Sequence, residues 1–199
     1  MSHANQVVTP LAPRCLTSEN AADQRRLRDA FGTFATGVVA LASELDGRAV
    51  GLVASTFVAV SLDPPIASVS ISNSSTTWPA MRRAGALGVT VLAADQGEAC
   101  RALAGPAEHR FEGLDYTVLP SGAVTVAGGL ATFECSVLRV VEAGDHGLVL
   151  LNIRGYRLQN SSAAPLVVHR SGHGTFSSTT WSGEPRPASS LTATRMEQR

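Results

Sequence analysis

A mainly β fold, closed or partly closed into a barrel with a few helices around it, is the fold class that this sequence predicts. From residue 38 onward, apolar residues gather in short runs bounded by turn residues, which is typical of strands. Asp46-Gly47 separates the first two runs and is typical of a tight hairpin turn, so these two strands are expected to be antiparallel. Helical periodicity is confined to a few segments, and a doubly wound sheet is therefore not expected.

The first helix is expected over residues 21–35. Asn20 is a suitable N-cap, and Leu27, Phe31 and Phe34 then recur at helical spacing. Two more helices are expected over residues 78–85 and 95–103, and strands are expected over residues 38–43, 48–57, 66–72, 87–92, 114–119, 131–142, 146–158 and 165–169.

The chain of 199 residues suits one domain with a single core. Residues 1–19 and 177–199 have no periodicity and few large aliphatic side chains, so both are expected to be flexible tails. The folded domain is therefore expected over residues 20–176.

All 16 basic residues are Arg, so the chain contains no lysine. This excludes a Schiff base with pyridoxal phosphate, a phosphate-binding loop ending in Gly-Lys-Ser/Thr and a Ser-x-x-Lys nucleophile pair. The 16 acidic residues balance the arginines, which disfavours a nucleic-acid partner. An anionic ligand must then be held by Arg, by hydroxyl groups or by backbone amides.

Three cysteines, Cys15, Cys100 and Cys135, lie far apart, so neither a disulfide framework nor a zinc site is expected. His169 and His173 are four residues apart, but the Gly-containing segment between them does not suit a helix, so no metal pair is expected. No apolar run reaches the length of a signal-peptide core or the roughly 18 residues of a membrane span. We therefore expect a cytoplasmic protein without a membrane partner.

Ser and Thr are frequent between residues 50 and 78, on two expected strands and at the start of the helix that follows. Hydroxyl groups and free amides at a helix start can hold a phosphate or an oxyanion, which suits a chain without lysine. The alternative is that these side chains face solvent and have no ligand.

An ordered series of motifs begins at Phe31, within a resemblance that covers about residues 27–170. It comprises FGTFATGVVAL, DGRAVGLVASTFVAVSLDPP, SNSSTTWPAMRRAGALGVTVLAADQ, HRFEG and ATFECSVLRVVEAGDH. In this order the motifs resemble the flavin reductase-like family, which has an FMN-binding split barrel. The resemblance implies a homodimer of six-stranded antiparallel Greek-key split β-barrels with a few peripheral helices. It also implies an NAD(P)H:flavin oxidoreductase that uses FMN or FAD with NADH or NADPH and supplies reduced flavin to a partner flavin-dependent monooxygenase.

Cofactor-binding residues follow from the same resemblance. The isoalloxazine ring is expected along residues 53–56, and the ribityl chain and phosphate along residues 70–77. The full set is Val53, Ala54, Ser55, Thr56, Ser70, Ser72, Ser74, Ser75, Thr77, Thr90, Val91, Leu92, Arg110 and Phe111. Because hydride would pass from nicotinamide C4 to flavin N5, the protein must stack two rings and needs no nucleophile.

The AGDH motif contains the expected catalytic residues, His146 and Asp145. By resemblance, the His146 imidazole packs on or bonds to the nicotinamide, and Asp145 orients the ring through Nδ1. The alternative is that His146 caps the Gly-Asp turn, where an Asp is also common. Trp78 either stacks on flavin or packs over one end of the barrel.

Four positions depart from the family pattern. Val53 and Gly147 stand where hydroxyl-bearing residues are usual, Leu151 where Gly is usual and Val168 where an aromatic residue is usual. We expect Leu151 to narrow the cofactor groove. Two other functions therefore stay open: a split-barrel protein whose tightly bound flavin serves another redox step in a biosynthetic pathway, and a non-enzymatic module that binds flavin or haem.

Overall fold

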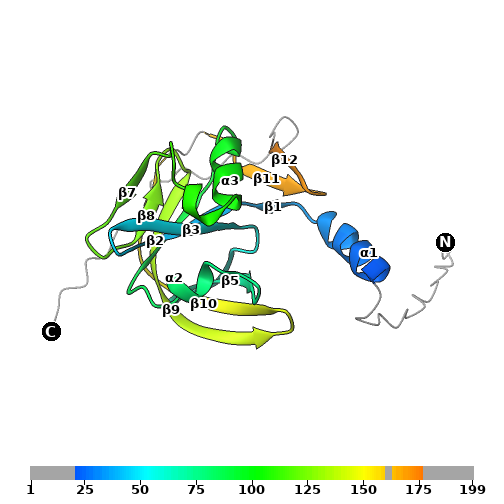
Figure 1. Ribbon diagram of the computed structural model, residues 1–199, viewed down its shortest axis with the longest axis horizontal. Coiled ribbons are helices and arrows are strands. Elements are labelled where there is room, and N and C mark those ends of the chain that lie inside the picture. Colours follow the sequence, from blue (N-terminus) through cyan, green and yellow to red (C-terminus); the bar gives the residue numbers. More distant parts are fainter. Residues whose placement is uncertain (1–20, 160–162, 177–199) are drawn as a thin grey trace, which may run out of the picture.

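The computed structural model describes residues 21–159 and 163–176 (Figure 1). The tails expected at residues 1–19 and 177–199 lie outside the described residues, as does Cys15. The described part is mainly β with few helices, as the sequence predicts. No helix in it has the length and the apolar character that crossing a membrane requires.

One antiparallel sheet of seven strands dominates the fold. Its strands are β2 (Val39–Leu45), β3 (Arg48–Ala54), β4 (Val58–Leu62), β5 (Pro65–Ser72), β6 (Leu87–Val91), β9 (Ala131–Ala143) and β10 (His146–Leu158). Their order across the sheet is β3-β2-β6-β9-β10-β5-β4. The two outer strands, β3 and β4, follow each other in the chain but do not pair, so the sheet is not closed by hydrogen bonds.

Two smaller sheets complete the β structure. They are formed by β1 (Thr36–Gly37), β11 (Leu166–His169) and β12 (Gly172–Thr175), and by β7 (Tyr116–Val118) with β8 (Val124–Val126). The expected number of six strands is therefore wrong, since the described residues form twelve. The additional strands are short, and a pattern of two to five residues is too brief for periodicity to reveal.

The hairpin turn expected at Asp46-Gly47 is confirmed. Both residues have positive φ, 52° and 74°, as a type I′ turn requires, and β2 pairs with β3 on either side of them. A second hairpin joins the two longest strands: His146 pairs with Ala143 across Gly144-Asp145. This turn fixes where His146 begins β10.

The segment expected as one strand over residues 48–57 is interrupted at Ser55. The Thr56 hydroxyl donates to the Ser70 carbonyl at 3.1 Å and accepts the Ser70 N–H at 3.0 Å. The Thr56 side chain therefore bonds the Ser70 backbone groups, which would otherwise pair with the backbone of a continuing strand. The chain bends there, and β4 starts at Val58.

In the described part of the chain, four short helices accompany the sheets. They are α1 (Ala21–Gly32), α2 (Trp78–Met81), α3 (Gly97–Ala104) and the 3₁₀ turn η1 (Ala107–His109). Figure 1 shows α1 projecting away from the sheets. The sequence places Phe31 and Phe34 on the apolar face of a helix expected over residues 21–35, but α1 ends at Gly32, before Phe34. The two side chains are 71% and 76% exposed. That face is therefore not covered within the described part of the chain.

The core lies on one face of the large sheet. Val39, Leu41, Val69, Leu87, Val89, Cys135, Val149 and Leu151 form it together with Trp78 and Met81 from α2. A second cluster under α3 contains Val38, Ala40, Leu92, Cys100, Leu103, Val126 and Leu166. Gly88 permits the close crossing of β8 over β6, because a Cβ at this position would lie 1.9 Å from the Val124 carbonyl oxygen.

Candidate active site

The hydroxyl-rich strand β5 lies directly beside the start of β10. His146 is the ladder partner of Ser72, and Leu148 is the partner of Ser70. The antiparallel register therefore brings the expected catalytic residue to the end of the strand that carries the expected cofactor-binding serines. This is the central agreement between the expected site and the fold.

The bend after β3 adds two more hydroxyl groups to this region. The bonds between Thr56 and the Ser70 backbone hold residues 55–57 against β5. Ser55 next to it is exposed, and its hydroxyl makes no hydrogen bond within the described part of the chain. Ser55 is therefore free to bind a ligand, whereas the Thr56 hydroxyl is already engaged in holding the bend.

Asn73 ties the end of β5 to the turn that carries the catalytic pair. Its side-chain Nδ2 donates to the Gly144 carbonyl at 3.2 Å, and its backbone N–H donates to the Asp145 carbonyl at 2.9 Å. Sequence reasoning singled out the serines around Asn73 and missed Asn73 itself. No local signal could have found it, because its partners lie about seventy residues further along the chain.

His146 and Asp145 form a hydrogen-bonded pair, with 2.8 Å between Nδ1 and Oδ1. This hydrogen bond, together with the nearby charge of His146, lowers the pKa of Asp145. The His146 side chain is 43% exposed. With Nδ1 bonded to the carboxylate, Nε2 has no partner among the described residues and can meet a ligand. Neither ring nitrogen bonds to the turn backbone, which argues against the capping role.

A hollow of about 210 Å³ lies at the start of β10, and neither His146 nor Asp145 lines it. Ser72, Asn73, Ser75, Trp78, Arg82 and Gly147 are among the residues that line it. The Ser75 hydroxyl accepts the Trp78 N–H at 3.1 Å, so it also fixes the start of α2. A Cβ at Gly147 would lie 3.2 Å from Val140, so even a small side chain there would crowd that residue. Trp78 is 8% exposed and packs in the core while one part of it reaches the hollow.

Arg110, expected at the phosphate, makes three hydrogen bonds within the fold. Its Nε donates to the Gly105 carbonyl at 2.8 Å, and one terminal nitrogen donates to the Gly51 carbonyl at 2.7 Å and to the Thr77 hydroxyl at 2.9 Å. The guanidinium thus joins β3, the start of α2 and the segment after α3. Phe111 packs against the second core cluster and stacks edge-on with Tyr116 at 5.4 Å. Three hydrogen bonds therefore hold Arg110 within the fold, and its second terminal nitrogen has no hydrogen-bond partner among the described residues.

The side chains expected on β6 and β3 point mostly into the protein. Thr90 and Leu92 are fully buried, and the Thr90 hydroxyl accepts the Val126 N–H. Val53, Ala54 and Val91 are partly buried against the two core clusters. Leu151 is fully buried in the core, so its expected narrowing of the groove is wrong: its bulk fills the interior.

Known proteins resemble this chain over most of its length. The profile of the family described as Flavin reductase like domain matches residues 31–177. The chain is 35% identical over 158 residues to a protein named flavin reductase from Pseudomonas putida, covering 79% of this chain and 92% of that one. It is 38% identical over 152 residues to a probable flavin reductase from Rhizobium meliloti, covering 76% of this chain but only 48% of that longer protein.

Two solved structures are similar across most of the fold. Nitrilotriacetate monooxygenase component B from Mycobacterium thermoresistibile superposes with a TM-score of 0.79 at 26% identity, over 86% of this chain and 97% of that one. The NADH:FAD oxidoreductase SgcE6 of Streptomyces globisporus, in complex with NAD and FAD fragments, gives a TM-score of 0.75 at 26% identity, over 81% and 97%.

Proposed function

Because this chain belongs to the flavin reductase like domain family, we propose that its hydroxyl-lined site beside His146 reduces flavin. The protein is an NAD(P)H:flavin oxidoreductase that supplies reduced flavin to a partner flavin-dependent monooxygenase. The observation that carries the site assignment is the ladder pairing of His146 with Ser72, which places one exposed imidazole beside a row of serines.

The donor set of this site fits a flavin. Ser55, Ser70 and Ser72 offer neutral hydroxyl groups, which suit the polar edge and the ribityl chain of a flavin. Arg82 lines the same hollow as Ser72 and Ser75, and its guanidinium forms no hydrogen bond or ion pair with the described residues. We therefore assign the binding of the flavin phosphate to Ser75 and Arg82, in place of the expected Arg110.

His146 and Asp145 act on the nicotinamide side. A bound flavin accepts a hydride from NADH or NADPH, so this step asks the protein for no nucleophile and no strong base. The Asp145 carboxylate holds Nδ1 of His146, which fixes the ring plane and leaves Nε2 toward the ligand. Asn73 holds the turn on which both residues lie. These groups position the nicotinamide, and positioning is what a hydride transfer requires of them.

A homodimer of split barrels is the assembly that we propose. The outer strands β3 and β4 do not pair with each other, and this opening in the sheet corresponds to the split of a split barrel. Small-molecule sites usually enclose about 300–1,000 Å³, and the hollow lined by Ser72, Ser75 and Arg82, at about 210 Å³, is smaller. A second copy of the chain would supply the missing wall. Many large apolar side chains are exposed and available for that contact, among them Phe31, Phe34, Val58, Val60, Leu62, Leu138 and Tyr156.

The activity is tested by mixing the purified protein with NADH and either FMN or FAD and following absorbance of the nicotinamide. Rapid loss of NADH that depends on added flavin is the expected result. A yellow protein that retains flavin but does not oxidise NADH would indicate the alternative role in another redox step. A protein that neither binds nor reduces flavin would exclude both.

A further inference from the structure

A second pocket lies at the opposite end of β10 from His146. Its volume is about 330 Å³, and Thr117, Thr125, Thr132, Glu134, Arg157 and Gln159 are among the residues that line it. Arg157 is eleven positions along the strand from His146, which corresponds to roughly 35 Å in an extended chain. The pocket shares no residue with the expected or proposed flavin site.

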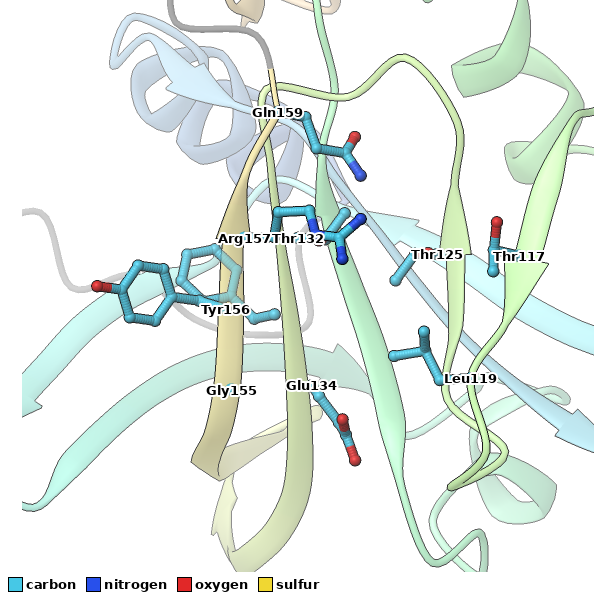
Figure 2. A pocket seen from close by; sticks show the side chains of 10 residues that line it. Thr117, Leu119, Thr125, Thr132, Glu134, Gly155, Tyr156, Arg157 and Gln159 are labelled. Carbon is cyan, nitrogen blue, oxygen red and sulfur yellow. The ribbon is translucent and has the colours of Figure 1, made fainter. Parts of the chain in front are cut away.

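The fold builds this pocket between the β9–β10 pair and the β7–β8 ribbon. Arg157 is the ladder partner of Thr132, and Gly155 is the partner of Glu134. Arg157 and Glu134 therefore lie on the same face of the sheet, two residues apart along the strands, or about 7 Å. Figure 2 shows both side chains pointing toward the ribbon, while Tyr156 points the opposite way.

The polar side chains of this pocket form no hydrogen bond or ion pair inside the described part of the chain. Arg157 makes no ion pair or hydrogen bond there, and neither does Glu134. By contrast, the Nε of nearby Arg154 donates to the Ser136 hydroxyl at 3.1 Å. A guanidinium and a carboxylate that share a pocket without contacting protein groups are available to a ligand.

Two buried threonines that line the pocket also indicate that it can bind a ligand. Thr125 and Thr132 are 8% and 7% exposed, yet their hydroxyl groups form no hydrogen bond with the described residues. No fully enclosed side-chain oxygen or nitrogen in that part of the protein lacks a partner. The two hydroxyl oxygens must therefore be accessible from the pocket. Buried hydroxyl groups nearly always have a hydrogen-bond partner, so the partner of these two must be a ligand or water.

The chemistry of these groups defines what would bind. The planar fork of Arg157 matches a carboxylate or a phosphate group. Glu134, about 7 Å away, accepts a hydrogen bond from a hydroxyl group. The volume of about 330 Å³ lies within the range of small-molecule sites. We propose that this pocket binds a small hydroxylated anion, with its acidic group on Arg157 and its hydroxyl groups on Glu134 and the threonines.

Binding is tested by titration calorimetry on the full chain, with glycerol 3-phosphate and L-malate as probes and glycerol as the uncharged control. We expect at least one of the two anions to bind and glycerol not to bind. Binding of the phosphate alone or of the carboxylate alone supports the proposal and identifies the acidic group. Absence of binding by both anions at millimolar concentration would overturn it.

Two variants locate the binding. Arg157→Gln removes the charge, and Gly155→Val fills the space beside Glu134, where an added Cβ meets no atom within 4 Å. Each should weaken anion binding by about tenfold or more, whereas Arg154→Gln on the same strand should not change it. NADH oxidation with FMN should stay normal in all three, which shows that they fold and separates this proposal from the flavin site. Unchanged anion binding in both Arg157→Gln and Gly155→Val would refute the assignment.

Discussion

The Arg110 guanidinium donates a 2.9 Å hydrogen bond to the Thr77 hydroxyl. The same nitrogen also donates to the Gly51 carbonyl, and the Nε donates to the Gly105 carbonyl. One side chain thus joins the strand that leads into the Ser55 bend with the first turn of α2. The residue that sequence reasoning assigned to a phosphate group holds together the walls of the proposed flavin site.

Arg110→Gln should therefore lower stability first and flavin affinity second. Hydrogen bonds made by a charged group contribute about 1.5–3 kcal/mol each, and we expect a loss of about 2 kcal/mol in the free energy of unfolding, measured with urea. Arg83→Gln serves as the control, because Arg83 is exposed and its side chain forms no hydrogen bond or ion pair with the described residues. If Arg110→Gln loses flavin affinity at unchanged stability, Arg110 contacts the cofactor directly.

Two serines of the proposed site should respond differently to replacement by alanine. The Ser55 hydroxyl has no partner among the described residues, so Ser55→Ala should weaken flavin binding about tenfold or less and leave stability unchanged. Ser75→Ala should weaken binding and also destabilise the fold, because the Ser75 hydroxyl accepts the Trp78 N–H. Flavin fluorescence titration and thermal unfolding measure the two effects. Equal stability changes in both variants would contradict this distinction.

His146→Ala should affect the nicotinamide and spare the flavin. The exposed imidazole is held by Asp145 at the end of the serine row, and its removal should lower kcat/KM for NADH about tenfold. Stopped-flow reduction of bound flavin and a flavin titration separate the two steps. Asp145→Asn should have a smaller effect in the same direction, because the ring stays but is less well oriented. Unchanged kinetics in His146→Ala would assign the residue to the turn alone.

Local patterns predicted the parts of the fold that depend on neighbouring residues. The Asp46-Gly47 turn and the strands near residues 131–142 and 146–158 were visible because turn chemistry and long apolar runs are local signals. The end of β3 was not visible, because it depends on bonds between Thr56 and Ser70, fourteen residues apart. The exposure of Phe31 was also hidden, since periodicity gives an apolar face but does not say what covers it.

The proposed site likewise combines residues that the sequence could identify with contacts between residues far apart in the chain. The family resemblance named Ser72 and His146 separately, and only the register of β5 against β10 makes them neighbours. Residues that act through distant backbone groups, such as Asn73 and Arg110, could not be assigned from the sequence. Leu151 was expected to narrow the groove because the family usually has Gly there. The strand pattern alone does not tell which face is the interior, and Leu151 lies on the interior face.

The two described cysteines should resist thiol reagents in the native protein. Burial and then the nearby Glu134 charge raise the pKa of the Cys135 thiol to about 12, and burial raises that of Cys100. In a Cys15→Ser background, an aromatic disulfide reagent at pH 8 should label neither thiol while the protein is folded. As the protein unfolds, Cys100 should react before Cys135. Rapid labelling of Cys135 in the folded protein would contradict its placement in the core.

The same shift gives a pH dependence of stability. A thiol whose pKa is higher in the folded protein than in the unfolded chain contributes stability below the unfolded pKa, which is near 9.0 for Cys135. That contribution is lost as the pH rises from about 9 toward about 12, where the folded thiol ionises. A Cys135→Ala variant, compared by urea unfolding across this range, should lose less stability with rising pH than the parent chain.

The proposed homodimer can be tested on the exposed edge strand β4. Val60 is 55% exposed on this strand, which lies at the end of the large sheet and pairs only with β5. An exposed apolar edge favours pairing with another chain, and a charge placed there opposes it. Val60→Asp should therefore shift the molecular mass measured by light scattering from twice the 20.7 kDa of one chain toward a single chain.

Val118→Asp is the matched control for this change. Val118 is 40% exposed on β7, in the separate two-stranded ribbon, so the same added charge should leave a dimer intact. If the second copy supplies the missing wall of the site, the monomeric Val60→Asp variant should also bind flavin more weakly, and the control should not. A parent chain that is monomeric at micromolar concentration and still reduces flavin at full rate would show that one copy makes a complete site.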